Sequence, residues 1–317
     1  MKKTISICIP VYNESSNISI AIQEVESLFD QQLSQYHLEI IVTDNASTDN
    51  TWQVVQELAA SRPYLRAFRF SRNFGYQNSV FAGLSLAAGD AVIEMDADLE
   101  DPPAIIPEFV AKWEEGHDIV YGVRSRRYGS KLFLFAVQRF YRILNAMSDI
   151  HIPENAGDFR LLDRKVVDIL RELPERNLYL RGLVSFIGFD QCPVLYDRNE
   201  RLNGKSKFKV MHYFALALDA LTSFSKKPLR LIGSLGVLLF IFSGALALFY
   251  FIGYLIGGNE VRGFTTLVIL TLFLHSATFI FLGVLGEYLS RIFDDSKFRP
   301  RVIIREAIHT DNPPPFI

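Results

Sequence analysis

GDAVIEMDADLEDPP, residues 89–103, runs from an apolar segment directly into a cluster of acids. The apolar part is typical of a buried strand, and five carboxylates follow within eight residues, from Glu94 to Asp101. Acids in this position belong either to a solvated loop or to a metal site. The rest of the sequence decides between the two interpretations.

Short apolar runs alternate with helical patterns from the start of the chain up to and including this stretch. The apolar runs cover residues 4–13, 38–47, 65–71 and 89–98, and the helical patterns cover residues 17–29, 48–60 and 75–88. This alternation predicts an α/β fold with a parallel, doubly wound sheet.

Polar residues end all four expected strands, at 12–14, 44–45, 71–73 and 96–98. Ligands of such sheets bind beyond the carboxyl ends of the strands, so we expect these residues to converge. In an extended segment, the side chains of Asp96 and Asp98 point the same way and repel each other unless a cation lies between them. Carboxylate ligands favour Mg²⁺ or Mn²⁺, shared with substrate phosphates.

Two long runs near the carboxyl end, residues 231–258 and 263–286, contain no Asp, Glu, Lys or Arg. Each exceeds the roughly 20 apolar residues that cross a bilayer. Core helices of a soluble protein are the alternative, but such helices are shorter and amphipathic. Cations lie before the first run and after the second, so the positive-inside rule predicts a hairpin with both termini in the cytoplasm. These cations are Lys226, Lys227, Arg230, Arg291, Lys297, Arg299 and Arg301.

The expected organisation is therefore a cytoplasmic α/β domain over residues 1–225, two membrane helices within 229–290 and a cytoplasmic tail over 291–317. The helices are placed at about 231–257 and 264–288. Segments 131–147 and 207–224 have amphipathic patterns, which suit either core-facing helices or helices at the membrane interface. The strand-like stretch in the tail, residues 299–307, pairs either within the chain or between subunits of a homo-oligomer.

Composition excludes several classes of protein. The net charge of −2 offers no basic field for nucleic acid. The two cysteines, Cys8 and Cys192, cannot form a disulfide framework and lack metal-ligand spacing.

Six motifs occur in an order that resembles the family 2 glycosyltransferases of the GT-A fold. They are IPVYNE (9–14), VTDNASTDNT (42–51), NFG (73–75), EMDADLEDPP (94–103), GDFRLLDR (157–164) and RLNGKSKF (201–208). With two carboxyl-terminal spans, the chain is similar to polyprenyl-phosphate glycosyltransferases. These include dolichyl-phosphate mannose synthase and, closer still, the bacterial undecaprenyl-phosphate glucosyltransferases of O-antigen glucosylation.

The resemblance implies a role for each matching position. The nucleotide-sugar pocket would be lined by Pro10, Tyr12, Glu14, Asp44, Arg72 and Asp96, with Asp44 toward the base. Asp98 would bind the Mg²⁺ or Mn²⁺ that bridges the donor diphosphate, together with Asp96. Glu100 stands where the family often has Gln, so its role as a third metal ligand stays open.

The same resemblance assigns catalysis to Asp98, Asp158 and Arg160. Asp158 would act at the donor sugar or acceptor, as a base or as a positioning residue, and Arg160 would bind a phosphate. A surface ion pair with Arg164 is the alternative for this segment. The basic loop would bind phosphate through Arg201, Lys205, Ser206 and Lys207.

The implied reaction is inverting transfer of a hexose to undecaprenyl or another polyprenyl phosphate at the cytoplasmic face of the inner (plasma) membrane, for cell-envelope glycosylation. Glucose from UDP-glucose is favoured, and mannose, an aminoarabinose derivative or an N-acetylhexosamine remain alternatives. A processive polysaccharide synthase is less favoured, because neither Trp52 nor Trp113 lies in a Gln-x-x-Arg-Trp motif. A non-catalytic membrane sensor of nucleotide sugars is the third interpretation.

Overall fold

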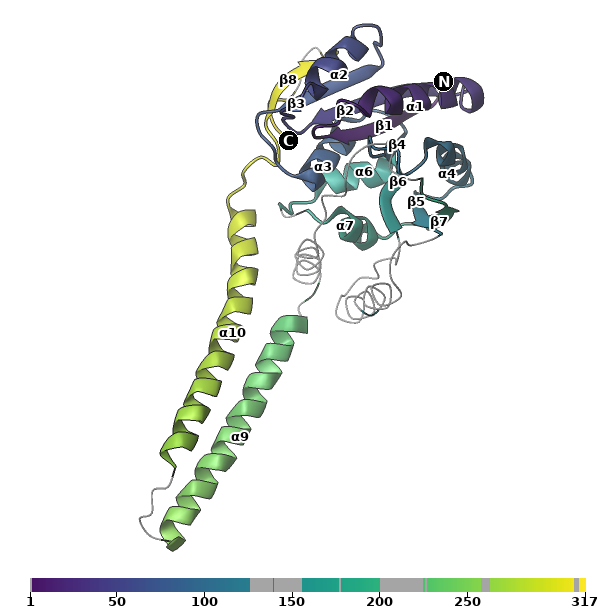
Figure 1. The fold of residues 1–317 in the computed structure, drawn as a ribbon. Coiled ribbons are helices and arrows are strands. Elements are labelled where there is room, and N and C mark those ends of the chain that lie inside the picture. The colour runs from purple at the N-terminus through teal and green to yellow at the C-terminus, as the bar shows by residue number, and fades with distance from the viewer. Residues whose placement is uncertain are drawn as a thin grey trace.

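The computed structural model describes residues 2–125, 139, 156–176, 178–199, 225, 227–257, 263–310 and 314–317. Within these residues the chain forms a sheet covered by helices on both faces, from which two long helices project side by side (Figure 1). Most of the amphipathic segments 131–147 and 207–224, and the basic loop with Arg201, Lys205, Ser206 and Lys207, lie outside the described residues.

The alternation expected in the amino-terminal half is confirmed. The elements are β1 (Thr4–Val11), α1 (Ile18–Gln32), β2 (His37–Asp44), α2 (Thr51–Ala59), β3 (Leu65–Phe70), α3 (Tyr76–Leu86) and β4 (Ala91–Glu94). β1 pairs in parallel with β2 and β4, and β2 pairs in parallel with β3. Helical crossovers join these strands, which is the connection that parallel pairing requires.

The second half of the sheet is mixed, and so departs from the parallel, doubly wound sheet that the alternation predicted. Its elements are the 3₁₀ turn η1 (Pro103–Ile105), α4 (Ile106–Glu114), β5 (Ile119–Arg124), β6 (Ala156–Asp163), α6 (Arg164–Glu172), α7 (Leu180–Ile187), β7 (Gln191–Tyr196) and β8 (Ile304–Ile308). The strand order is β7-β5-β6-β4-β1-β2-β3-β8. β6 runs antiparallel to β4 and β5, and β8 antiparallel to β3. β6 and β8 come later in the chain, after long intervening segments. They lie outside the regular strand–helix alternation on which the prediction was based.

Alternate residues of the strands pack into two hydrophobic layers, one on each face of the sheet. Ile5, Ile7 and Ile9 of β1 pack in one layer with α1, α2 and α4, whereas Cys8 faces the other layer with α3, α6 and α7. Because side chains alternate across a strand, a strand buried on both faces reads as a continuous apolar run. This explains why β1, β2 and β4 were recognisable in the sequence.

The projecting helices are α9 (Lys227–Gly257) and α10 (Phe264–Ser296). Both are long and apolar enough to cross a membrane, and none of their most apolar 18-residue windows is buried within the described structure. This exposure disagrees with the alternative of core helices in a soluble protein. α10 extends beyond the expected end near residue 288, into the charged segment up to Ser296.

The tail after α10 returns to the domain and adds β8 to the edge of the sheet beside β3 (Figure 1). In this structure the strand-like stretch of the tail therefore pairs within the chain. The backbone N–H groups of Arg301 and Val302 donate to the carbonyl of Ile317, and Arg301 donates through its guanidinium to the carbonyls of Leu173 and Glu175. Several independent contacts thus hold the tail on the domain.

The two hydrophobic layers generate a stability prediction. Leu161 of β6 is fully buried, and Leu195 of β7 is 69% exposed. We expect Leu161→Ala to lower the free energy of unfolding of the domain by about 2–5 kcal/mol, because it removes packed methyl groups and leaves a cavity. Leu195→Ala, the matched control, should change it by less than about 0.5 kcal/mol.

The measurement is chemical denaturation of the full chain in detergent, followed by the fluorescence of its two tryptophans, Trp52 and Trp113, which both lie in the domain. Equal effects of the two substitutions would contradict the assignment of Leu161 to the core.

Candidate active site

Three loops follow the carboxyl ends of β1, β2 and β4, and each contains a non-glycine residue with positive φ. These residues are Asn13 (58°), Ala46 (59°) and Leu99 (55°). Left-handed backbone costs an alanine or leucine about 1 kcal/mol or more, and such strain concentrates at functional sites. The three strained loops lie at the edge where the polar strand ends were expected to converge.

The first two loops are held together by hydrogen bonds. The side-chain oxygen of Asn13 accepts from the N–H of Thr48 at 2.8 Å, and Ser47 accepts from the N–H of Asn13 at 2.9 Å. Thr51 accepts from the N–H of Glu14, also at 2.9 Å. The β1 loop and the β2 loop therefore form one rigid surface.

The predicted pocket residues in these loops differ in accessibility. Pro10 is buried within β1, opposite Thr43 of β2. Tyr12 is 39% exposed. A carboxylate oxygen of Glu14 accepts from the side chain of Asn17 at 2.7 Å, so Glu14 also supports the start of α1. Tyr12 thus presents the accessible surface, and Pro10 and Glu14 shape the backbone beneath it.

Asp44 ends β2 and is completely buried. Its Oδ1 accepts from the N–H of Ser47 at 3.0 Å, whereas Oδ2 accepts no hydrogen bond from the described residues. Oδ2 lies 3.3 Å from Nε of Arg69. Burial raises the pKa of Asp44, although the bonds from Ser47 and the charge of Arg69 oppose this effect. A donor group of a ligand would satisfy this oxygen.

The cation beside Asp44 is Arg69, which is not among the predicted pocket residues. Arg72 stacks 4.1 Å over the ring of Phe74 and donates to the carbonyl of Asn73, on the next strand-end loop. The parallel register places Arg69 directly opposite Asp44. Sequence reasoning missed Arg69 because the relevant signal is this register, which no local motif contains.

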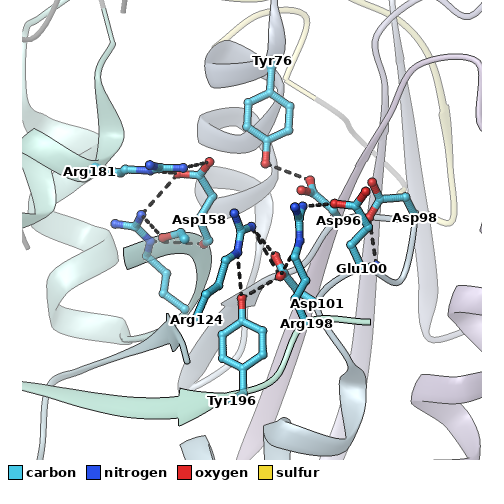
Figure 2. Close-up of polar contacts among 12 residues, drawn as sticks. Tyr76, Asp96, Asp98, Glu100, Asp101, Arg124, Asp158, Arg181, Tyr196 and Arg198 are labelled. Carbon is cyan, nitrogen blue, oxygen red and sulfur yellow. Dashed lines mark hydrogen bonds and ion pairs between the residues drawn. The ribbon is translucent and has the colours of Figure 1, made fainter. Parts of the chain in front are cut away.

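The acids after β4 divide into two groups (Figure 2). Asp96 accepts a 2.8 Å hydrogen bond from the hydroxyl of Tyr76, and Asp98 accepts from the N–H of Glu100 at 3.1 Å. Burial and the adjacent charge of Asp98 raise the pKa of Asp96 to about 7, although the bond from Tyr76 lowers it. A buried carboxylate next to a second one forms a site that a cation would stabilise.

The other two acids are paired with arginines. Glu100 forms an ion pair with Arg198. Asp101 lies 3.1 Å from Arg124 and accepts a 2.6 Å hydrogen bond from the hydroxyl of Tyr196. Arg198 would therefore compete with a metal ion for Glu100, whose role as a third metal ligand the sequence left open.

Asp158 and Arg160 lie on β6, two residues apart, as the extended segment predicted. Arg181 of α7 binds both oxygens of Asp158, at 2.7 and 2.8 Å (Figure 2). Burial opposes ionisation of Asp158, but the charges of Arg181, Arg160 and Arg124 lower its pKa to about 2. A carboxylate with such a low pKa is a poor general base and a well-fixed positioning group.

Arg160 is almost fully buried and donates to the carbonyls of Gly157 and Asp158. Its Nε lies 3.6 Å from a carboxylate oxygen of Glu94, which is its register partner on β4. Burial raises the pKa of Glu94, as do the charges of Asp158 and Asp96, while Arg160 lowers it. The alternative of a surface ion pair with Arg164 is wrong, because Arg164 donates to the carbonyls of Ala87 and Gly89.

Comparison with known proteins identifies the family. The family model described as glycosyl transferase family 2 matches residues 6–170, which contain β1 to β6 and most of α6. The chain belongs to this family.

Three relatives are similar along nearly their whole length. The SfII prophage-derived bactoprenol glucosyl transferase of Shigella flexneri is 40% identical, over 98% of this chain and 99% of the relative. The prophage bactoprenol glucosyl transferase homolog of Escherichia coli is 38% identical, over 96% and 99%. The uncharacterized glycosyltransferase YkcC of Bacillus subtilis is 39% identical, over 97% and 95%. The similarity therefore includes the apolar hairpin as well as the family 2 domain.

Among the described residues of this glycosyltransferase, no three His, Cys, Asp or Glu side chains are grouped so that they hold a metal ion by themselves. Asp96 and Asp98 are the carboxylates that fit a divalent cation, since burial and then the adjacent charge of Asp98 raise the pKa of Asp96, and a cation would offset both effects. Mg²⁺ in such enzymes is typically held by one or two carboxylates together with substrate phosphates. The donor set is consistent with that arrangement.

The lowered pKa of Asp158 gives a pH-dependent prediction. Its ordinary value is 3.8 and the folded value is about 2, so the ionised group adds stability above pH 3.8 that is lost as the pH falls through 2. We expect Asp158→Asn to cost about 2 kcal/mol of unfolding free energy at pH 7. This difference from the wild type should shrink as the pH falls from 4 to 2.

Denaturation of the metal-free chain at a series of pH values measures this difference. Asp168→Asn is the matched control, because Asp168 is a half-exposed acid on α6 whose ion pairs contribute little. A difference for Asp158→Asn that stays constant from pH 7 to pH 2 would contradict the assigned ion pair.

Proposed function

We propose that this family 2 enzyme transfers glucose from UDP-glucose to undecaprenyl phosphate or a similar polyprenyl phosphate. The observation that carries the proposal is the similarity to the bactoprenol glucosyl transferase of Shigella flexneri along the whole of both chains. The apolar hairpin of α9 and α10 supports a lipid acceptor, because the acceptor phosphate lies at a bilayer surface.

The donor binds at the strand-end loops in this proposal. The buried Oδ2 of Asp44 accepts the N–H of the uracil ring, and Tyr12, Pro10 and Glu14 shape the wall of the pocket. Asp96 and Asp98 would hold Mg²⁺ or Mn²⁺, and the cation would supply neutralisation of charge on the leaving diphosphate. Glu100 would join them as an additional ligand in competition with Arg198.

The acceptor needs little activation by a base. A phosphate monoester has a second pKa of about 6, so its oxygen is mostly ionised at neutral pH. This oxygen attacks the anomeric carbon in line and forms the new C–O bond. The bond from that carbon to the diphosphate oxygen breaks, and UDP leaves with the electron pair. The configuration at the anomeric carbon is inverted. Asp158, which is fixed by Arg181 and has a pKa of about 2, positions the sugar or acceptor rather than removing a proton.

The basic loop remains part of the proposal although it lies outside the described residues. Arg201, Lys205, Ser206 and Lys207 would bind phosphate oxygens of the donor or acceptor. Arg124 and Arg181 are further cations at the site, and both are already paired with carboxylates. The resemblance also implies that Arg160 binds a phosphate. Because Arg160 is nearly buried, it supports the site from beneath in this proposal.

A transfer assay tests the reaction. Purified full-length protein in detergent receives undecaprenyl phosphate, Mg²⁺ or Mn²⁺ and labelled UDP-glucose, UDP-GlcNAc or GDP-mannose in separate reactions. We expect lipid-extractable label from UDP-glucose alone, lost with EDTA. Asp98→Ala should lower the rate roughly 100-fold or more, the usual cost of removing a group that stabilises developing charge. Asp168→Ala on α6 should have no such effect.

Label from another donor would replace glucose in the proposal while keeping the class of reaction. Nucleotide binding without transfer from any of these donors would contradict the proposed reaction.

The proposed location is the inner membrane with the domain and both termini in the cytoplasm, which the flanking cations favour. In a Cys192→Ser background, we expect Glu260→Cys, between the two spans, to react with a membrane-impermeant maleimide in intact cells. Glu172→Cys, exposed at the end of α6, should react only after lysis. The reverse labelling pattern would overturn the orientation.

A further inference from the structure

Strand β8, which follows the second apolar helix, pairs with β3, the neighbour of β2, whose loop is proposed to receive the base of the nucleotide (Figure 1). Its register with β3 places Glu306 directly opposite Arg69. The tail is fixed in this position, since Val302 is fully buried and exchanges two backbone hydrogen bonds with Ile317. Glu306 is therefore presented by a well-anchored strand.

Glu306 contacts two side chains next to the loop after β2. One carboxylate oxygen accepts a hydrogen bond from Nε1 of Trp52 at 3.0 Å, and the other lies 3.5 Å from Nη1 of Arg69. The guanidinium of Arg69 also lies 5.8 Å from the centre of the Trp52 ring. Glu306 thus connects the tail to β3 and to the first turn of α2.

Arg69 in turn contacts the loop itself. Its Nε lies 3.3 Å from Oδ2 of Asp44, and its Nη2 donates to the carbonyl of Ser47 at 3.4 Å. One guanidinium therefore lies between Asp44 and Glu306, and the position of each carboxylate depends on the other. Because Oδ2 of Asp44 is buried without a hydrogen bond from the described residues, the guanidinium of Arg69 is the charged neighbour that can orient this oxygen toward a ligand.

We propose that Glu306 is a positioning residue for donor binding, which acts through Arg69 and Trp52 to align Asp44 with the base of a uridine nucleotide. The inference rests on the proposed function, in which the loop of Asp44 receives the base. The segment that follows the second apolar helix thus contributes to the affinity for the donor, although it lies far in sequence from the family 2 motifs.

Two substitutions separate the contacts of Glu306. Glu306→Gln retains an oxygen that accepts from Trp52 but removes the charge beside Arg69, and Glu306→Ala removes both. Glu57→Gln is the matched control, because Glu57 is an exposed acid on α2, the helix that carries Trp52.

The experiment measures the affinity of the full chain in detergent for UDP by calorimetry in the presence of Mn²⁺, together with kcat and KM for UDP-glucose. We expect Glu306→Gln to weaken UDP binding about fivefold, the upper range for a partly exposed charge pair. KM should rise in proportion, while kcat and the melting temperature without nucleotide stay near the wild-type values. Glu306→Ala should weaken binding further, and Glu57→Gln should not change it.

Wild-type affinity in Glu306→Gln would overturn the inference. So would a parallel fall of affinity, kcat and melting temperature, which indicates a purely structural role. Failure of the wild type to bind UDP would overturn this inference together with the nucleotide site. UDP binding that responds to Glu306 in a chain that transfers no glucose would support the inference and contradict only the proposed reaction.

Discussion

The pairing of β4 is the constraint on which the site depends. β4 lies between β1, to which it is parallel, and β6, to which it is antiparallel. The parallel pairing brings the acids after β4 to the same edge as the loops after β1 and β2. The antiparallel pairing places Arg160 opposite Glu94, so Asp158, two residues earlier on β6, reaches the same edge. Without the reversed direction of β6, this aspartate would not meet the acids that follow β4.

Such a concentration of carboxylates is stable only because guanidinium groups are interleaved with it. Arg181 binds Asp158, Arg124 lies against Asp101, and Arg198 pairs with Glu100. Asp96 accepts instead from the neutral hydroxyl of Tyr76, and its pKa rises to about 7. Buried carboxylates that lack a countercharge shift toward the neutral form. The guanidinium at Asp158 and the neutral hydroxyl at Asp96 therefore distinguish these two acids in the proposed chemistry.

The sequence predicted the strand ends but not the partners that hold them. β1 to β4 were recognisable because each is a short apolar run with a polar end, and parallel pairing alone brings those ends together. Arg181, Arg69 and Glu306 carried no local signal, since each meets its carboxylate through register or through packing of distant segments. Arg72 and Arg69 illustrate the limit. Arg72 lies in the loop, where motifs are read, whereas Arg69 lies in the strand, where its role depends on a neighbour. The direction of β6 and β8 was missed for the same reason.

The return of the tail fixes the carboxyl-terminal end of the apolar hairpin to the domain. Tyr288 of α10 donates to the carbonyl of Ser225, which lies just before α9, and Asp295 accepts from the N–H of Arg176. Beyond α10, Arg301 and β8 extend the contact to the opposite end of the sheet from β7. A hairpin whose second helix is held against the domain by several contacts has less freedom to tilt than one held by a single linker. In the proposed reaction the acceptor phosphate lies at a bilayer surface, and this restriction would keep the acid-lined edge at a constant distance from that surface.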